Sequence, residues 1–269
     1  MREVVADVQD LHRRADNAGA LFQVASQFNL LEMAHPDLTP EHGVGIYEHD
    51  PTQGPACAIA AGAGTIFRNY FVQVNGQVGQ SAGNQIDCLA DVGRMLGNAR
   101  GRLWTMRNGY ALASASGLRE ISQRLAASST AELDALRGQL RIGVQWQTQV
   151  TLAGCVHLVS QAYCSALPVT YGVHAPGLWE GFARLVLEAS YEATICAALL
   201  NAQQHGDKRV FLTLVGGGAF GNEEDWILAA IGRALSLHRA SDLDVVIVSH
   251  RASNPKVRAL LRQHALPAA

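Results

Sequence analysis

The stretch from residue 209 to residue 250 constrains the fold of this chain most. "RVFLTLV", Arg209–Val215, and "LDVVIVSH", Leu243–His250, are short apolar runs bounded by turn residues, as expected of buried strands. Between them, "EEDWILAAIGRALSLHR" has acids in its first turn and basic residues in its last, which suits the dipole of a helix. Strand, helix and strand in this order predict a right-handed crossover and a mainly parallel sheet.

The remaining sequence alternates between helical and extended patterns, as expected of an α/β protein. Residues 178–204 place apolar side chains at helical spacing and are followed by "HGDK", so we expect a long helix there. Ala20–Asn29 predicts a strand that leads into a polar loop, and residues 42–55 predict a loop. Residues 56–74 predict a helix over their first half and a strand over their second. Residues 149–171 predict either a strand pair or one strand preceded by a helical turn.

The segment 76–150 has weaker signals. Ser129 followed by Glu132 is the capping pattern that begins a helix, and "GYALASASG" fits a hairpin strand. No shift in composition marks the segment as independent. We therefore expect one domain over residues 1–269, with residues 76–150 as an insertion.

Composition and charge narrow the possible partners. With 48% apolar and 16% charged residues the chain should fold, and its net charge of −2 gives no basic stripe for extended nucleic acid. No apolar run reaches the roughly 18 residues of a membrane helix, and the N-terminus lacks the apolar core of a signal peptide. We expect a soluble, cytoplasmic protein that does not bind membranes.

Neither the cysteines nor the histidines predict a metal site or a disulfide framework. The five cysteines are widely spaced without a CxxC pair, which favours free buried thiols. His35, His42 and His49 recur every seven residues, but metal ligands usually come in closer, convergent pairs. We expect neither a metal nor a cofactor.

The glycine turn after the first apolar run allows two interpretations. The N–H groups of Gly216, Gly217 and Gly218 could converge on an anion at a helix N-terminus, or the glycines could form a corner that needs positive φ. The turn matches neither a Walker motif nor GxGxxG. The acids of residues 223–225 would repel an anion unless they point away, and we interpret them as helix-start residues, with Asn222 as a good N-cap.

Polar residues at the end of the first predicted strand form a second candidate site, because open α/β sheets bind ligands at that edge. The residues concerned are Ser26, Gln27 and Asn29, together with Asp50, Thr52 and Gln53 in a loop restrained by Pro51 and Pro55. The alternative is a solvated loop in which Asp50 forms an Asx turn.

Together, "SQFN" after a strand, the following loop into a helix, and "GGGAFGN" between the last two strands resemble the macrodomain family. That fold has three layers around a mainly parallel mixed sheet. In the family, an asparagine-ended loop lies near the distal ribose of ADP-ribose, and a glycine-rich loop wraps the diphosphate. Gly216 and Gly218 match the paired glycines, Phe220 the aromatic residue and Gly221 the closing glycine. The resemblance covers residues 20–75 and 150–250.

Some positions depart from the family pattern. "SQFN" replaces an asparagine-rich motif, so only Asn29 carries over directly, and "DPTQGP" replaces a polyglycine run. The first loop looks more like a divergent branch of macrodomain-type ADP-ribosylhydrolases, which includes bacterial effectors that remove ADP-ribose from arginine. The resemblance implies a ligand-binding set of Gln27, Asn29, Gln53, Gly54, Gly216, Gly217, Gly218, Ala219, Phe220, Gly221 and Asn222.

The resemblance also implies a reaction. Cleavage at C1″ of the distal ribose passes through an oxocarbenium-like state that a carboxylate can stabilise. Asp50 is the first candidate and Glu41 the second, followed by Glu32, Glu223 and Glu224. We expect hydrolysis of ADP-ribose from modified protein, with arginine as one possible linkage. The alternatives are a non-catalytic module that binds ADP-ribose, or a site for another nucleotide or phosphate-containing metabolite.

Overall fold

The core of the protein is a six-stranded sheet in which the strands are parallel except at one edge. The computed structural model describes residues 1–264. The strand order is β1-β10-β9-β2-β8-β7, and β7 pairs antiparallel with β8. The bounds are β1 Arg2–Val5, β2 Leu21–Ala25, β7 Gly143–Gln149, β8 Leu158–Cys164, β9 Arg209–Leu212 and β10 Asp244–Ser249. The mixed, mainly parallel α/β sheet predicted from the sequence is confirmed.

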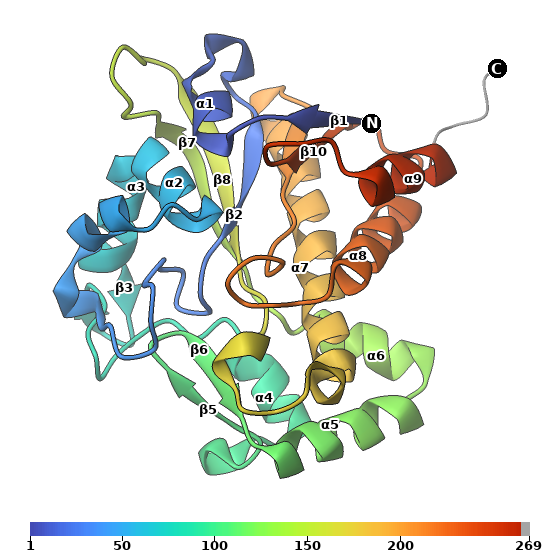
Figure 1. Cartoon of the computed structure of the whole chain (residues 1–269). Coiled ribbons are helices and arrows are strands. Elements are labelled where there is room, and N and C mark those ends of the chain that lie inside the picture. Colours follow the sequence, from blue (N-terminus) through green and yellow to red (C-terminus); the bar gives the residue numbers. More distant parts are fainter. Residues whose placement is uncertain (265–269) are drawn as a thin grey trace.

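Helices cover both faces of this sheet, so the domain has three layers (Figure 1). In β2, Leu21 packs with the larger hydrophobic cluster and Phe22 with the smaller one, because successive side chains of a strand point to opposite faces. The larger cluster lies under α7 Pro176–His205, α8 Glu224–Leu237 and α9 Pro255–His264. The smaller one lies under α1 Val8–Arg13 and α2 Gln53–Ala60.

The long helix predicted at residues 178–204 is α7. It is long and apolar enough to cross a membrane, but 61% of its most apolar window is buried inside the protein. Its buried side chains include Trp179, Phe182 and Tyr191. This burial is typical of the central helix of a soluble protein.

The segment 76–150 packs its helices on the same side as α7. It contains α4 Ala90–Leu96, the hairpin of β5 Trp104–Arg107 and β6 Tyr110–Ala113, α5 Ala115–Ala127 and α6 Thr130–Arg137. α6 begins with the predicted capping box of Ser129 and Glu132. The segment also includes β7, so its last residues belong to the main sheet rather than to an insertion. Neither alternative for residues 149–171 is correct: the range holds one strand, β8, without a helical turn before it, and the paired strand β7 ends at Gln149.

The strand predicted over the second half of residues 56–74 is wrong. The chain continues from α2 into α3 Gly62–Ile66 and a π-helical turn, η4 Phe67–Phe71, before the two-residue strands β3 Gln73–Val74 and β4 Gln77–Val78. In η4 the polar Arg68 and Asn69 are buried, whereas Phe67 and Phe71 are exposed. This inverted pattern hides the helical periodicity, which normally places apolar residues inward.

The predicted loop at residues 42–55 contains short helical turns. The structure has 3-10 turns at η2 Pro40–His42 and η3 Val44–His49, and α2 begins at Gln53. Tyr47 of η3 is 1% exposed and packs in a small separate core with Leu31, Met33 and Ala58. The remaining 3-10 turns are η1 Ala15–Asn17, η5 Ala99–Gly101 and η6 Val169–Tyr171.

Candidate functional site

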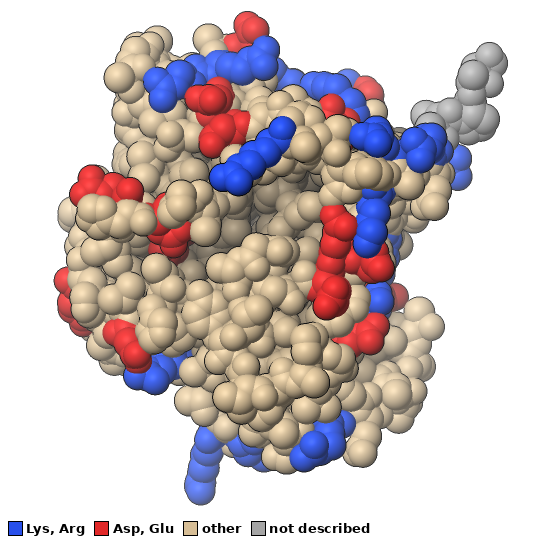
Figure 2. Space-filling view, in the orientation of Figure 1, with Lys and Arg blue, Asp and Glu red and all other residues tan. Residues whose placement is uncertain are grey.

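A cavity of about 510 Å³ lies where the parallel strands end. Its walls include residues one or two positions after β1, β2, β8, β9 and β10, namely Ala6, Ser26, Ala166, Thr213 and His250. β8 lies on one side of β2 in the sheet, and the next strand in the sequence, β9, lies on the other side of β2. The direction of the strand order therefore reverses at β2. Such a switch point is where open α/β sheets bind ligands. Figure 2 shows a hollow on this face of the molecule.

The glycine loop between β9 and α8 forms one wall of the cavity. Gly216 and Gly221 have φ of +83° and +66°, and a Cβ at either would lie 2.4 Å from Ala166 or 2.2 Å from Thr170. These two glycines are therefore required by the turn itself. A Cβ at Gly218 would meet no atom within 4 Å, and Gly218 lines the cavity. Packing therefore does not explain a glycine at position 218.

The loop offers backbone N–H groups that have no acceptor among the described residues: those of Gly216, Gly218, Ala219 and Phe220. Thr170 binds the carbonyl oxygens of Ala219, through its hydroxyl, and of Phe220, through its N–H at 3.2 Å. Because N–H and C=O point in opposite directions across a trans peptide, the N–H of Phe220 points away from Thr170. An anion could be bound by these groups.

The acidic residues after the loop are not part of the cavity wall, although Glu224 contacts Asn254, which is. Asn254 donates a hydrogen bond to Glu224, and Lys256 lies 3.3 Å from Glu224 and 2.8 Å from Asp225. None of residues 223–225 lines the cavity. The expected N-cap at Asn222 is wrong: α8 begins at Glu224 with Glu223 as N-cap, and the Asn222 amide instead donates to the Leu167 carbonyl at 2.8 Å.

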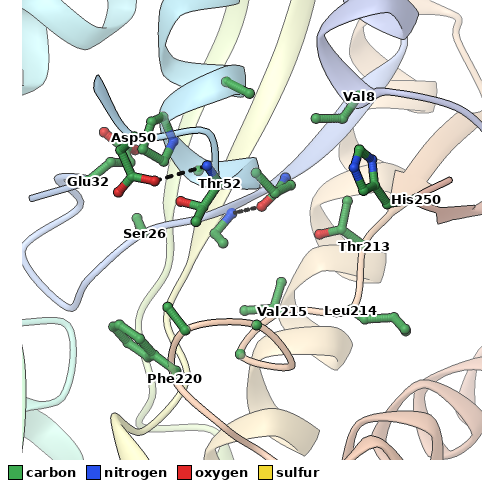
Figure 3. Close-up of a pocket in the computed structure, with 18 of the residues that line it drawn as sticks. Val8, Ser26, Glu32, Asp50, Thr52, Thr213, Leu214, Val215, Phe220 and His250 are labelled. Carbon is green, nitrogen blue, oxygen red and sulfur yellow. Dashed lines mark hydrogen bonds between the residues drawn. The ribbon is translucent and has the colours of Figure 1, made fainter. Parts of the chain in front are cut away.

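Asp50 lies on the wall opposite the glycine loop (Figure 3). Its Oδ1 accepts a hydrogen bond from the Thr52 N–H at 2.9 Å, which is the Asx turn considered from the sequence. Its Oδ2 has no hydrogen-bond donor among the residues that the structure describes. The carboxylate therefore shapes the loop with one oxygen and presents the other for a further contact.

A second carboxylate, that of Glu32, lies in the same wall but is almost completely buried. Nη2 of Arg68 lies 2.9 and 3.1 Å from its two oxygens. Arg68 is held by the Leu30 carbonyl at 2.8 Å, and its guanidinium carbon lies 3.6 Å from the centroid of the Tyr163 ring. Burial raises the pKa of Glu32 to about 7, although Arg68 acts in the opposite direction.

Tyr47 links the two acidic positions. Its hydroxyl accepts a hydrogen bond from the Glu32 N–H at 3.0 Å, and its carbonyl accepts one from the Asp50 N–H at 3.1 Å. Because the Tyr47 ring is fixed in the small core with Leu31 and Met33, the Asp50 loop is held against the segment that follows β2.

Two of the expected ligand residues line the cavity but use their amides within the fold. Gln53 accepts from the Ala25 N–H at 2.8 Å and donates to the Gln23 carbonyl at 3.0 Å, as a neighbouring strand would. Gln27 accepts from the Met33 N–H at 2.8 Å. Gly54 also lines the cavity, and a Cβ there would lie 2.2 Å from the Ala25 carbonyl oxygen. These residues shape the wall.

Other expected residues lie outside the cavity walls: Asn29, Glu41, Gly217, Gly221 and Asn222. Asn29 is fully buried, accepting from the Leu31 N–H at 3.1 Å and donating to Gln85 at 2.8 Å. Glu41 accepts from the Ala82 N–H at 2.8 Å. The structure therefore brings together Asp50, Glu32, Gln27, Gln53, Gly54, Gly216, Gly218, Ala219 and Phe220.

Several cavity residues were not expected from the sequence. Two of them, Tyr110 and Tyr171, form an aromatic cluster with the expected Phe220, with ring centroids 5.0 to 5.6 Å apart. Tyr110 comes from the hairpin within residues 76–150. Thr213 and His250 lie at the other end (Figure 3). Both follow buried strands, so the rule that led to Ser26 could have found them. No comparable signal marks Tyr110.

Among residues 1–264, no group of His, Cys, Asp and Glu side chains has the arrangement of a metal site. His35 and His42 instead bind their near neighbours Asp37 and Thr39. The five cysteines are free thiols, as expected, but only Cys57, Cys88 and Cys164 are buried. The chain matches no family model, and no curated protein matches its sequence.

Proposed function

We propose that this chain binds ADP-ribose in the cavity and removes it from modified protein. One observation carries the proposal: free backbone N–H groups of the loop Gly216–Phe220 and the Asp50 carboxylate line opposite walls of the same cavity. Its volume of about 510 Å³ lies within the usual range for small-molecule sites. The loop would bind the diphosphate, and the distal ribose would lie toward Asp50.

Asp50 is the proposed catalytic group. Its free Oδ2 could stabilise positive charge at C1″ or activate water as the glycosidic bond breaks. A carboxylate at this position would also attract a guanidinium, so we propose arginine as the linked side chain. Glu32 is less suited to contact substrate, because its side chain is 1% exposed and paired with Arg68.

A non-catalytic module that binds ADP-ribose is the second candidate. The Asx turn of Asp50 and the amide contacts of Gln53 favour it, since both side chains already stabilise the loop. The free thiols, with Cys57, Cys88 and Cys164 buried, support a cytoplasmic location for either function.

Two measurements test the proposal. Calorimetry with ADP-ribose, ADP and inorganic phosphate should give binding that is strongest for ADP-ribose; no binding of ADP-ribose at millimolar concentration would exclude both candidates. Hydrolysis of ADP-ribosyl-arginine should be lost in Asp50→Asn, which keeps an oxygen for the Thr52 N–H but removes the charge.

Asp10→Asn is the matched control, because Asp10 has a 73% exposed side chain and lies outside the cavity. Equal rates for Asp50→Asn and the native chain would remove Asp50 from catalysis. Binding of ADP-ribose by a native chain that releases none from modified protein would leave the binding module.

A further inference from the structure

The helical segment after α2 has a large uncharged surface. Between Pro51 and Ile86 the sequence has one charged residue, Arg68, and that residue is buried. Six large apolar or aromatic residues within this stretch are 38 to 58% exposed. We call them the aromatic face: Ile59, Ile66, Phe67, Tyr70, Phe71 and Val78.

The members of the aromatic face come from elements that are next to one another. Ile66, Phe67, Tyr70 and Phe71 recur at helical spacing through α3 and η4, so they share one side of the helix. Val78 is the last residue of β4. The residue after it, Gly79, donates its N–H to the carbonyl of Val72, the residue after η4, at 2.8 Å, so β4 lies beside η4. In Figure 1, α3 and β3 lie at the opposite side of the molecule from α8 and α9.

The exposed apolar area is at the upper end of the range for a protein that is alone in solution. At roughly 150 to 250 Å² for each large side chain, about half of it exposed, the six side chains present roughly 500 Å². That is comparable with the largest patches on monomers, and such patches commonly mark interaction sites. Exposed Ala63, Gln73, Asn75, Gly76 and Gln77 adjoin the face and extend the uncharged area toward the roughly 800 Å² that each partner buries in a stable interface.

The aromatic face has no charge of its own, which limits what can cover it. The exposed Glu41 lies nearby, because Asn69 donates a hydrogen bond to the Pro40 carbonyl and the Ala82 N–H donates one to Glu41. An anionic membrane is a poor partner, because membrane-surface helices usually place Lys or Arg beside their apolar residues and residues 51–86 expose none. A charged protein surface would bury unpaired charges against the face. An uncharged apolar surface fits best, and an identical patch meets that requirement across a two-fold axis without any complementary charge.

The neighbouring edge of the sheet does not favour pairing by strand addition. α3 packs so closely on β7 that a Cβ at Gly64 would lie 2.1 Å from the Gln145 side chain. β7 has an irregular register between Gln145 and Thr148, and Gln147 has φ of +48°. Such irregularity interrupts the regular ladder that an added strand would need. Contact at this side of the molecule must therefore use side chains.

We propose that the aromatic face is the contact surface of a homodimer, in which it packs against the same face of a second copy of this chain. Phe67 and Phe71 lie at the centre of the helical part of the face and are buried on association. The proposal does not depend on the function of the cavity.

Sedimentation equilibrium of the full chain tests it. The native protein should have twice its monomer mass of 28.8 kDa, and Phe67→Glu and Phe71→Glu should each return it to 28.8 kDa. Val173→Glu is the matched control, because Val173 is 97% exposed and lies outside the aromatic face; it should stay dimeric.

Circular dichroism of each protein shows whether a variant that has lost the dimer is still folded. Phe71→Ser is a milder variant that introduces no charge. A native chain of 28.8 kDa at every concentration would overturn the proposal. So would folded Phe67→Glu and Phe71→Glu variants that remain dimers. Sedimentation of the monomer with neutral phosphatidylcholine vesicles would assign the face to a lipid surface instead.

Discussion

The guanidinium of Arg68 and the carboxylate of Glu32 form an ion pair with side chains that are 4% and 1% exposed. Removing one partner of a buried pair leaves an uncompensated charge, which typically costs about 3–5 kcal/mol. We expect Arg68→Leu to lower the free energy of unfolding by about that amount at pH 8, where Glu32 is ionised, measured by urea denaturation. Arg102→Leu, at the half-exposed pair with Glu120, should change the midpoint little. Similar midpoints for both variants would contradict the stabilising role of the buried Arg68–Glu32 pair.

Burial of His12 should make the protein sensitive to acid. His12 is fully buried, and desolvation lowers its pKa from 6.5 to about 4. Between these values the unfolded chain binds the proton and the native state does not, so stability is lost as pH falls from 6.5 to 4. We expect His12→Gln to gain stability relative to the native chain over this range, by up to about 3 kcal/mol. The measurement is urea denaturation at a series of pH values; a constant difference would exclude His12 as the cause.

Glu32 should have the opposite pH dependence. Its pKa is raised from 4.5 to about 7, so between these values the native state holds a proton that the unfolded chain releases. The favourable contribution of that proton is present below pH 4.5 and is lost as pH rises to 7. The native chain should therefore lose stability relative to Glu32→Gln over this range, by up to about 3 kcal/mol. Thermal unfolding from pH 4.5 to 8 checks this; a difference that is independent of pH would show that Glu32 stays ionised beside Arg68.

The two cavity-lining glycines of the loop should respond differently to substitution. Gly216→Ala places a Cβ 2.4 Å from Ala166 at φ of +83°, so it should destabilise the fold by more than about 1–2 kcal/mol. Gly218→Val has open space and should leave the unfolding midpoint nearly unchanged. It should weaken ADP-ribose binding about tenfold or more, which is about 1.4 kcal/mol, by narrowing access to the N–H groups. Calorimetry measures the affinity of both variants for ADP-ribose, and urea denaturation measures their stability. A Gly218→Val variant that binds ADP-ribose as tightly as the native chain would contradict the proposed diphosphate site.

The C-terminal fold could be predicted because its signals are local. The apolar runs of β9 and β10, and the charges at the ends of α8, each depend on neighbours in the sequence. Phe67–Phe71 could not be predicted in this way, because its apolar side chains point outward and its buried Arg68 is paired with Glu32, which precedes it by 36 positions. Periodicity identifies a helix only when its buried side is apolar.

The candidate site could be predicted in part, because some of its signals are also local in the sequence. The rule that ligands bind at the ends of parallel strands correctly places Ser26, Gln27 and the glycine loop at one cavity. It does not show that the Gln53 amide would bind the backbone of β2, or that Asn29 would be enclosed beside Gln85. Those contacts join segments that are distant in sequence, and amides are suited equally to a ligand and to a backbone.

The strand order also determines when the cavity can exist during synthesis. β1 precedes the other strands of the sheet in the sequence, yet it pairs with β10, through Arg2 and Val246 among other residues. Ala6 and Asn254 line the same cavity, so a ribosome must make both segments, which are 248 positions apart, before the cavity closes. A ligand in the cavity would contact both segments together, and it would therefore stabilise only those chains in which both have folded.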